Sequence, residues 1–154
     1  MKSNTYGWEK DIVATIRIML VDDYRQWRVT LRSMLEAIDG FRVIAEAANG
    51  LEAVEQAAQS LPDIVLLDVS MPVMNGIEAA PRIRRSSPGS SIIFLSQDQD
   101  ADVRTAALAT GAQAYLSKST PIAELASTIR SVLMSQFADS APTASFHHIQ
   151  PVSP

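Results

Sequence analysis

Short apolar segments alternate with helix-patterned segments along most of this chain, and no other feature restricts its possible folds as strongly. A strand that is covered on both faces has a nearly continuous apolar sequence, because neither face meets water. Residues 64–67 (IVLL) have this character. We expect strands at residues 16–21, 41–47, 64–67, 91–95 and 114–116. Buried strands that alternate with helices indicate a parallel sheet with helices on both faces.

The segments between these strands carry helix signals. The first has its large apolar residues at the spacing of one helix face: Trp27, Leu31, Met34, Leu35 and Ile38. Asn49 and Glu52 have the spacing of a capping box, which predicts a helix that reaches about Ser60. A helix at residues 101–110 is expected to end at Gly111, because glycine adopts the left-handed conformation of that position easily.

Two of the expected helices contain proline. Pro81 lies within the expected helix at residues 76–85, and we expect it to bend that helix or delay its start, because proline lacks an N–H. In the last helix, Thr120 is the expected N-cap and Pro121 the first helical residue, where the missing N–H costs nothing. The buried stripe of this helix is expected to contain Ile122, Leu125, Ile129 and Val132.

These elements predict one domain of the α/β class. Five strand–helix units with right-handed crossovers favour a doubly wound, flavodoxin-like fold, which is a five-stranded parallel sheet of order 2-1-3-4-5 with five helices. We expect the domain at residues 15–135, after an N-terminal extension at residues 1–14. Residues 136–154 are rich in proline, alanine and serine, which is typical of a flexible tail or a truncated linker.

Composition excludes several classes of protein. Hydrophobic residues make up 47% of the 154, enough for a full core, and there is no cysteine for disulfides or thiolate chemistry. The net charge of −4 argues against direct nucleic-acid binding by this chain, because binding a phosphate backbone needs a basic face. No apolar run approaches a membrane span, and the N-terminus lacks the apolar core of a signal peptide. We therefore expect a soluble, cytoplasmic protein.

Polar residues follow the expected strands at the points where they end. Asp22 and Asp23 follow the first strand, and Asp68 follows the third. Ser96 follows the fourth strand, and Lys118 lies just beyond the fifth. A single aspartate after a strand is usually a turn former or a helix N-cap. The full set in this order favours a binding site instead, because ligands of such sheets bind beyond the carboxyl ends of the strands.

Three converging carboxylates need a positive charge, because their mutual repulsion would otherwise raise their pKa values. The chain offers the ammonium of Lys118, and a hard divalent cation such as Mg²⁺ would be held by carboxylate oxygens. Magnesium together with a lysine is a common set for phosphoryl transfer. An aspartate in such a site can be the nucleophile that forms an acyl phosphate.

The chain resembles the receiver domains of two-component response regulators. The resemblance lies in four segments: IRIMLVDD, LPDIVLLDVSMPVMNG, IIFLSQ and GAQAYLSKS. It covers about residues 15–135 and implies that Asp68 is the phosphoacceptor. It further implies that Asp23, Asp68 and the backbone carbonyl of Ser70 bind Mg²⁺ directly, while Asp22 acts mainly through water. The phosphoryl donor would be a histidine of a sensor histidine kinase.

The resemblance also implies how a signal leaves the site. Ser96 and Lys118 would hold the phosphoryl oxygens, and Tyr115 matches the aromatic residue that moves with Ser96. The protein would then be a signalling phosphoacceptor rather than an enzyme, although it would promote its own phosphorylation and dephosphorylation. Its output would be transcriptional, in another domain or partner. We expect the face at about residues 101–133 to carry the signal, through a phosphorylation-dependent homodimer or another partner.

Three features depart from the family pattern or qualify it. Gln97 occupies a position that usually holds a small residue, and its side chain is expected to crowd access to Asp68. Ser119 follows the lysine where proline is common, and the segment KSTPIAEL resembles receivers that precede helix-turn-helix DNA-binding domains. Only 19 residues follow Ser135, too few for three helices. The sequence leaves open whether the receiver stands alone or was cut in a linker.

Other functions compete with this interpretation. A phosphatase of the haloacid-dehalogenase type also uses an aspartate after a strand, Mg²⁺ and a lysine, but it needs a second acid where this chain has Ser70. A flavodoxin-like cofactor binder would need a phosphate loop where Asp22 and Asp23 would repel a phosphate. A degenerate receiver that only mediates contacts is disfavoured because the set of acids is intact.

Overall fold

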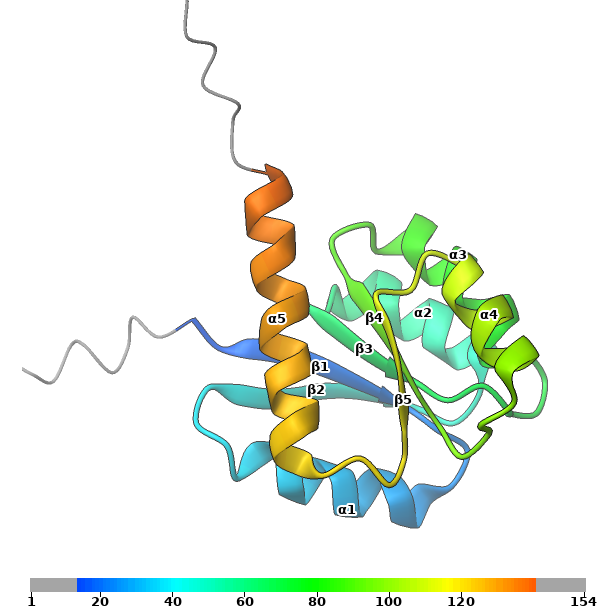
Figure 1. The fold of residues 1–154 in the computed structure, drawn as a ribbon, viewed down its shortest axis with the longest axis horizontal. Helices are drawn as coiled ribbons and strands as arrows, with labels where there is room; N and C mark the ends of the chain where they lie inside the picture. The colour runs from blue at the N-terminus through cyan, green and yellow to red at the C-terminus, as the bar shows by residue number, and fades with distance from the viewer. Residues whose placement is uncertain (1–13, 141–154) are drawn as a thin grey trace, which may run out of the picture.

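The computed structural model describes residues 14–140, which form one parallel sheet between two layers of helices (Figure 1). The strand order is β2-β1-β3-β4-β5, and every neighbouring pair is parallel. The strands are β1 (Ile16–Val21), β2 (Phe41–Ala47), β3 (Ile64–Leu67), β4 (Ser91–Ser96) and β5 (Ala114–Ser117). This is the five-stranded order expected from the sequence.

Five helices connect and cover the strands. They are α1 (Arg25–Glu36), α2 (Gly50–Ser60), α3 (Gly76–Ser86), α4 (Ala101–Ala109) and α5 (Ile122–Ser140). Helices α1 and α5 pack on one face of the sheet, and α2, α3 and α4 pack on the other (Figure 1). The parallel strands therefore have all their carboxyl ends at one edge of the sheet, and the loops that follow the strands lie there.

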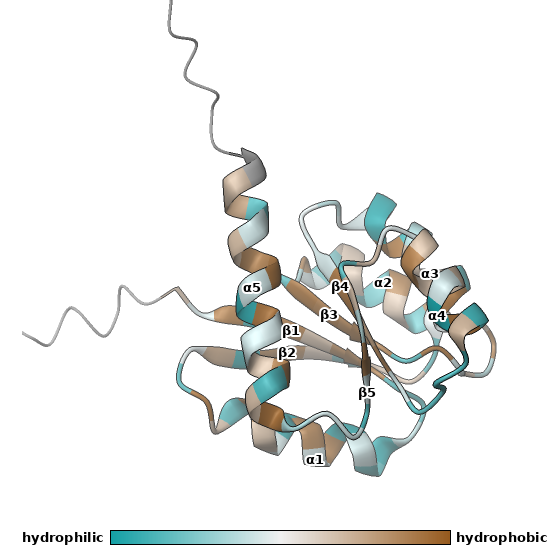
Figure 2. Ribbon diagram, viewed as in Figure 1, coloured by the Kyte–Doolittle hydropathy of each residue, from teal (hydrophilic) through white to brown (hydrophobic). Residues whose placement is uncertain are grey.

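The core consists of two apolar layers, one on each face of the sheet. Alternate residues of each central strand contribute to opposite layers: in β1, Met19 and Val21 face α2 and α3, whereas Ile18 and Leu20 face α1 and α5. The central strands are accordingly the most hydrophobic part of the ribbon in Figure 2. This double burial explains why the strand sequences are almost continuously apolar.

Most of the predicted elements are confirmed. The first three strands have the expected bounds, and β4 and β5 are each one residue longer than expected. The side chain of Asn49 caps α2 by accepting from the backbone N–H of Glu52 at 2.9 Å. Helix α4 is followed by Gly111 with φ of 92°, the left-handed conformation expected there. In the stripe of α1, Leu31 and Leu35 are buried, but Met34 is exposed.

Of the two effects expected of Pro81, the late start of α3 does not occur, because the helix begins at Gly76, where the side chain of Asn75 caps it. Two other expectations at helix ends were wrong. Helix α5 begins at Ile122, and the carbonyl of Pro121 accepts the first helical bond from Leu125, so Thr120 is not its N-cap. Helix α5 also continues past Ser135 to Ser140, since no proline interrupts it before residue 142. Residues 136–140 are therefore helical rather than part of a tail.

The remaining terminal segments, residues 1–13 and 141–154, lie outside the described residues. The expected N-terminal extension falls almost wholly in the first of them, and most of the expected tail falls in the second. Between residues 14 and 140, no helix is long and apolar enough to cross a bilayer.

Gly76 closes the loop after β3 onto the backbone of Asp68. Its N–H donates to the carbonyl oxygen of Val69 at 2.8 Å, and a Cβ at this position would lie 2.0 Å from the carbonyl oxygen of Asp68. We expect Gly76→Ala to lower the free energy of unfolding by about 1–3 kcal/mol, because the loop must move to relieve the clash. Urea unfolding measures the change.

The matched control for this substitution is Gly89→Ala. A Cβ at Gly89 would meet no heavy atom within 4 Å, so this substitution is expected to change stability little. If both alanine variants unfold at the same urea concentration, the close approach of Gly76 to Asp68 does not constrain the loop.

Candidate functional site

The loops at the carboxyl edge of the sheet surround an open cleft of about 650 Å³. The loops after β1, β3, β4 and β5 all contribute to it, as expected for a parallel sheet of this order. The lining residues are Asp22, Asp23, Tyr24, Asp68, Ser70, Ser96, Gln97, Asp98 and Lys118. Every predicted site residue except Tyr115 therefore borders one cleft.

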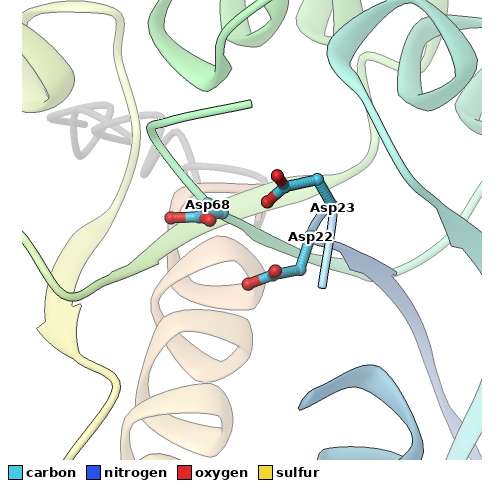
Figure 3. A group of neighbouring side chains, drawn as sticks. All are labelled: Asp22, Asp23 and Asp68. Atoms are coloured by element: carbon cyan, nitrogen blue, oxygen red, sulfur yellow. The ribbon is translucent and has the colours of Figure 1, made fainter. Parts of the chain in front are cut away.

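Three aspartates of the cleft lining lie close together (Figure 3). Carboxylate oxygens of Asp22, Asp23 and Asp68 lie within 4.8 Å of one another. A backbone hydrogen bond brings the ends of β1 and β3 together, because the N–H of Asp68 donates to the carbonyl of Val21 at 3.0 Å. The N–H of Asp22 donates to the carbonyl of Ala47 at the end of β2, at 3.1 Å. Asp22 and Asp68 are buried, whereas Asp23 is exposed.

Lys118 reaches this cluster from the end of β5. Its Nζ lies 2.5 Å from Oδ2 of Asp22 and 3.2 Å from Oδ2 of Asp68. Burial lowers the pKa of Lys118, but the hydrogen bond with Asp22 and the charge of Asp68 outweigh it, so the pKa is raised. The ammonium also lies 5.7 Å from the ring centroid of Trp27 in α1. Lys118 is thus a fixed positive charge against two buried carboxylates.

The environment of Asp68 disfavours the charged form of its side chain. Burial and the negative charge of Asp22 raise the pKa of Asp68 to about 6. Lys118 and the N–H of Val69, which donates to Oδ1 at 2.8 Å, only partly offset these effects. A further positive charge in the cleft would therefore favour the ionised form of Asp68.

The donors in the cleft fit a hard divalent cation. All the clustered side chains offer oxygen ligands, and none offers sulfur or imidazole. The carboxylate of Asp23 has no hydrogen-bond or ion-pair partner among residues 14–140, so its oxygens are available to a ligand. This chemistry suits Mg²⁺, which usually takes one or two carboxylates and keeps several waters.

Ser96 borders the cleft whereas Tyr115 does not, and the loop after β4 connects the two. The buried hydroxyl of Ser96 accepts from the N–H of Asp98 at 3.0 Å. Tyr115 is buried beneath the loop, and its hydroxyl donates to the carbonyl of Asp98 at 2.6 Å. Ser96 and Tyr115 are therefore linked through one residue, Asp98. Gln97 between them is exposed at the cleft.

Sequence reasoning missed two residues that shape the site. Asp98 links Ser96 to Tyr115 through backbone atoms, and nothing in its residue type reveals such a role. Arg28 donates from Nη1 to the carbonyl oxygen of Asp22 at 2.6 Å. Arg28 lies three residues before Leu31, on the buried stripe of α1. A charged residue is unusual at such a position, and this could have indicated from the sequence that Arg28 has a partner.

The chain is similar to many known proteins. Residues 18–130 match the family described as the response regulator receiver domain. The transcriptional regulatory protein LiaR of Bacillus subtilis is 39% identical over 115 residues, which cover 75% of this chain and 54% of LiaR. The chain thus spans about half the length of the curated relatives it matches.

Solved structures agree with this result. A two-component response regulator of the LuxR family from Aurantimonas sp. SI85-9A1 is 36% identical, with a TM-score of 0.74, over 79% of this chain and 87% of that chain. A CheX-CheY-BeF3-Mg+2 complex from Borrelia burgdorferi contains a chain that is 27% identical, with a TM-score of 0.71, over 77% of this chain and 90% of that one. The fold, the acidic cleft and these similarities together show that the chain belongs to the family of receiver domains of two-component response regulators.

Proposed function

We propose that Asp68 accepts a phosphoryl group from a phosphohistidine of a sensor histidine kinase. The observation that carries this proposal is the position of Asp68, which borders the open cleft with Asp22 and Asp23 close by and the Lys118 ammonium 3.2 Å from its Oδ2. Asp23, Asp68 and the backbone carbonyl of Ser70 would hold Mg²⁺, and Asp22 would act through water. The solved CheX-CheY-BeF3-Mg+2 complex from Borrelia burgdorferi supports this choice of ion.

In the proposed reaction, an oxygen of the Asp68 carboxylate attacks phosphorus. A bond forms between that oxygen and phosphorus, the bond between phosphorus and the histidine nitrogen breaks, and the electron pair leaves with the imidazole. Bound Mg²⁺ would supply charge neutralisation for the phosphoryl oxygens. The ammonium of Lys118 stabilises the same charge from the other side, and the Ser96 hydroxyl donates to a phosphoryl oxygen.

The switch would act through the loop that follows β4. The Ser96 hydroxyl now accepts from the N–H of Asp98, so a turn toward a phosphoryl oxygen gives up that bond. The backbone carbonyl of Asp98 accepts from the Tyr115 hydroxyl, so any shift of Asp98 changes the hydrogen bond that holds Tyr115. We propose that the signal leaves through α4, β5 and α5, and that it controls a homodimer or another partner on that face. The name of LiaR supports a transcriptional output.

A small-molecule phosphodonor tests this function. With acetyl phosphate and Mg²⁺, intact-mass measurement is expected to show one phosphoryl adduct that hydroxylamine removes, and EDTA is expected to prevent it. Absence of the adduct in the presence of Mg²⁺ would overturn the proposal. The family match does not support the alternative of a haloacid-dehalogenase-like phosphatase. Sustained turnover of nitrophenyl phosphate would be the sign of such an enzyme.

Lys118→Ala is expected to uncouple phosphorylation from output while leaving the fold intact. Without the ammonium, Asp22 and Asp68 are less neutralised, so we expect Mg²⁺ to bind at least as tightly as in the wild type. The phosphorylated state, in contrast, loses a contact that distinguishes it from the unmodified state. Amide exchange with and without beryllofluoride measures the response of residues 101–133.

The control for this substitution is Lys118→Arg, which keeps the positive charge at the same position. We expect it to retain part of the exchange response that Lys118→Ala loses. A full response of residues 101–133 in Lys118→Ala would show that the lysine does not transmit the signal.

A further inference from the structure

We propose that Arg28 of α1 is a positioning residue for the cation site, because it fixes the peptide group between Asp22 and Asp23. This inference rests on the proposed function, since it concerns the Mg²⁺ that Asp23 would hold. It adds a residue from a helix that contributes none of the cluster's carboxylates. Arg28 would not touch the cation itself, because its contact is with the main chain of the acid pair.

The hydrogen bond of Arg28 restrains the acid pair directly. Nη1 of Arg28 donates to the carbonyl oxygen of Asp22 at 2.6 Å, and the arginine side chain is only 14% exposed. This carbonyl belongs to the same planar peptide group as the N–H of Asp23. Because Arg28 holds this carbonyl, it also holds the orientation of the peptide group that leads into Asp23. The direction of the Asp23 side chain is thereby restrained.

The rest of Asp22 is already held by other parts of the chain. Its N–H donates to Ala47, its Oδ1 accepts from the N–H of Tyr24 at 2.9 Å, and its Oδ2 contacts Lys118. Asp23 differs, because its carboxylate is exposed and has no partner among the residues that the structure describes. Its direction must therefore be set through the backbone. The bond from Tyr24 to Oδ1 of Asp22 spans Asp23, and the Arg28 bond restrains the peptide group that leads into it.

Glu46 of β2 holds Arg28 in place and offsets its charge. Nε of Arg28 lies 3.2 Å from Oε1 of Glu46, and Nη1 of Arg32 lies 2.9 Å from Oε2. Glu46 pairs in register with Leu20, two residues before Asp22. The guanidinium thus gives a directional hydrogen bond to the acid loop, while the carboxylate beside it reduces the repulsion that a cation in the cleft would feel.

A purely structural role for Arg28 makes a different prediction. If the arginine only ties α1 to β2, its loss should lower stability and leave cation affinity unchanged. Loss of a nearby positive charge should, by itself, strengthen cation binding slightly. Weaker Mg²⁺ binding in an Arg28 variant would therefore require a change of geometry.

The test compares Arg28→Met with Arg32→Met by calorimetric titration with Mg²⁺. Arg32 is a matched control, because it shares Glu46 but donates to the carbonyl of Val43 instead of Asp22. We expect Arg28→Met to weaken Mg²⁺ binding roughly 10-fold, as is common for residues that orient metal ligands, and Arg32→Met to leave it nearly unchanged. Arg28→Lys keeps a donor and should recover part of the affinity.

A second measurement uses the metal-free protein, so that it does not depend on the proposed function. In EDTA, the amides of Asp23 and Tyr24 are expected to exchange faster in Arg28→Met than in Arg32→Met. If wild type binds no Mg²⁺, the proposed function fails, and the exchange result alone decides whether Arg28 orders this peptide. Equal exchange in the two variants, or Mg²⁺ affinity in Arg28→Met equal to that of wild type, would overturn the role of Arg28.

Discussion

Asp68→Asn is expected to abolish the phosphoryl adduct and, in metal-free buffer, to make the domain more stable. The adduct disappears because an amide oxygen does not attack phosphorus as a carboxylate does. The stability rises because the native environment disfavours the Asp68 carboxylate, whose pKa is raised from 3.8 to about 6. Function and stability are therefore expected to change in opposite directions at one buried residue.

The pH dependence follows from the direction of this pKa shift. Between about pH 4 and 6, folded Asp68 retains a proton that the unfolded chain has released, so stability falls as pH rises through this window. Above about pH 6 the full penalty is present, on the order of 1–3 kcal/mol. Urea unfolding in EDTA should show Asp68→Asn to be more stable than wild type at about pH 8 and closer to it at about pH 5.

Asp98→Asn is the control for both measurements. Asp98 lines the same cleft but lies outside the group of three aspartates, so its amide variant should still form one adduct. If Asp68→Asn forms the adduct in wild-type yield, another residue is the phosphoacceptor. If it is less stable than wild type above about pH 6, the Asp68 carboxylate is better solvated than its burial indicates.

Asp23→Asn is expected to weaken Mg²⁺ binding by on the order of 100-fold. The substitution removes a full negative charge from the exposed acid of the cluster, whose carboxylate no lysine or arginine among residues 14–140 neutralises. Calorimetric titration measures the affinity directly. Fluorescence of Trp27 provides a second signal, since its ring lies near Lys118, and a Trp8→Phe background removes the only other tryptophan.

Asp22→Asn is the informative comparison for this prediction. Asp22 already forms a 2.5 Å ion pair with Lys118 and accepts from the N–H of Tyr24, so less of its charge is available to a cation. We therefore expect a smaller loss of affinity than in Asp23→Asn. The reverse order would mean that the buried acid is the principal ligand and that Lys118 moves away when the cation binds.

The sequence predicted the strands and the edge where the site lies, because both depend on local patterns. The residues before Asp22 are apolar because β1 is buried on both faces. Since β1 and β3 are neighbours in the sheet, Asp68 at the end of β3 lies beside Asp22 at the end of β1. Helix ends were harder, because the first turn of α5 depends on which carbonyl accepts first, Pro121 or Thr120. Pro121 therefore lies one residue before the helix that it was expected to begin.

The hydrogen bonds that connect side chains within the site could not be predicted from sequence patterns. Tyr115 was expected to move with Ser96, but no sequence pattern indicated that Asp98 connects them, through its backbone N–H to Ser96 and its carbonyl to Tyr115. The contact of Arg28 with Asp22 similarly depends on the length and direction of a long side chain across a helix–strand boundary. Such contacts are set by three-dimensional packing, and many residue types are compatible with the same local pattern.

The length of α5 has a mechanical consequence. The helix begins four residues after Lys118 and is continuous for 19 residues to Ser140, which corresponds to about 28 Å. A rigid rod of this length converts rotation at its base into displacement at its tip, so a tilt of about 5° at the Lys118 end would move the far end by about 2.5 Å. Small rearrangements at the acid cleft would therefore be amplified at the exposed side chains of Met134 and Phe137.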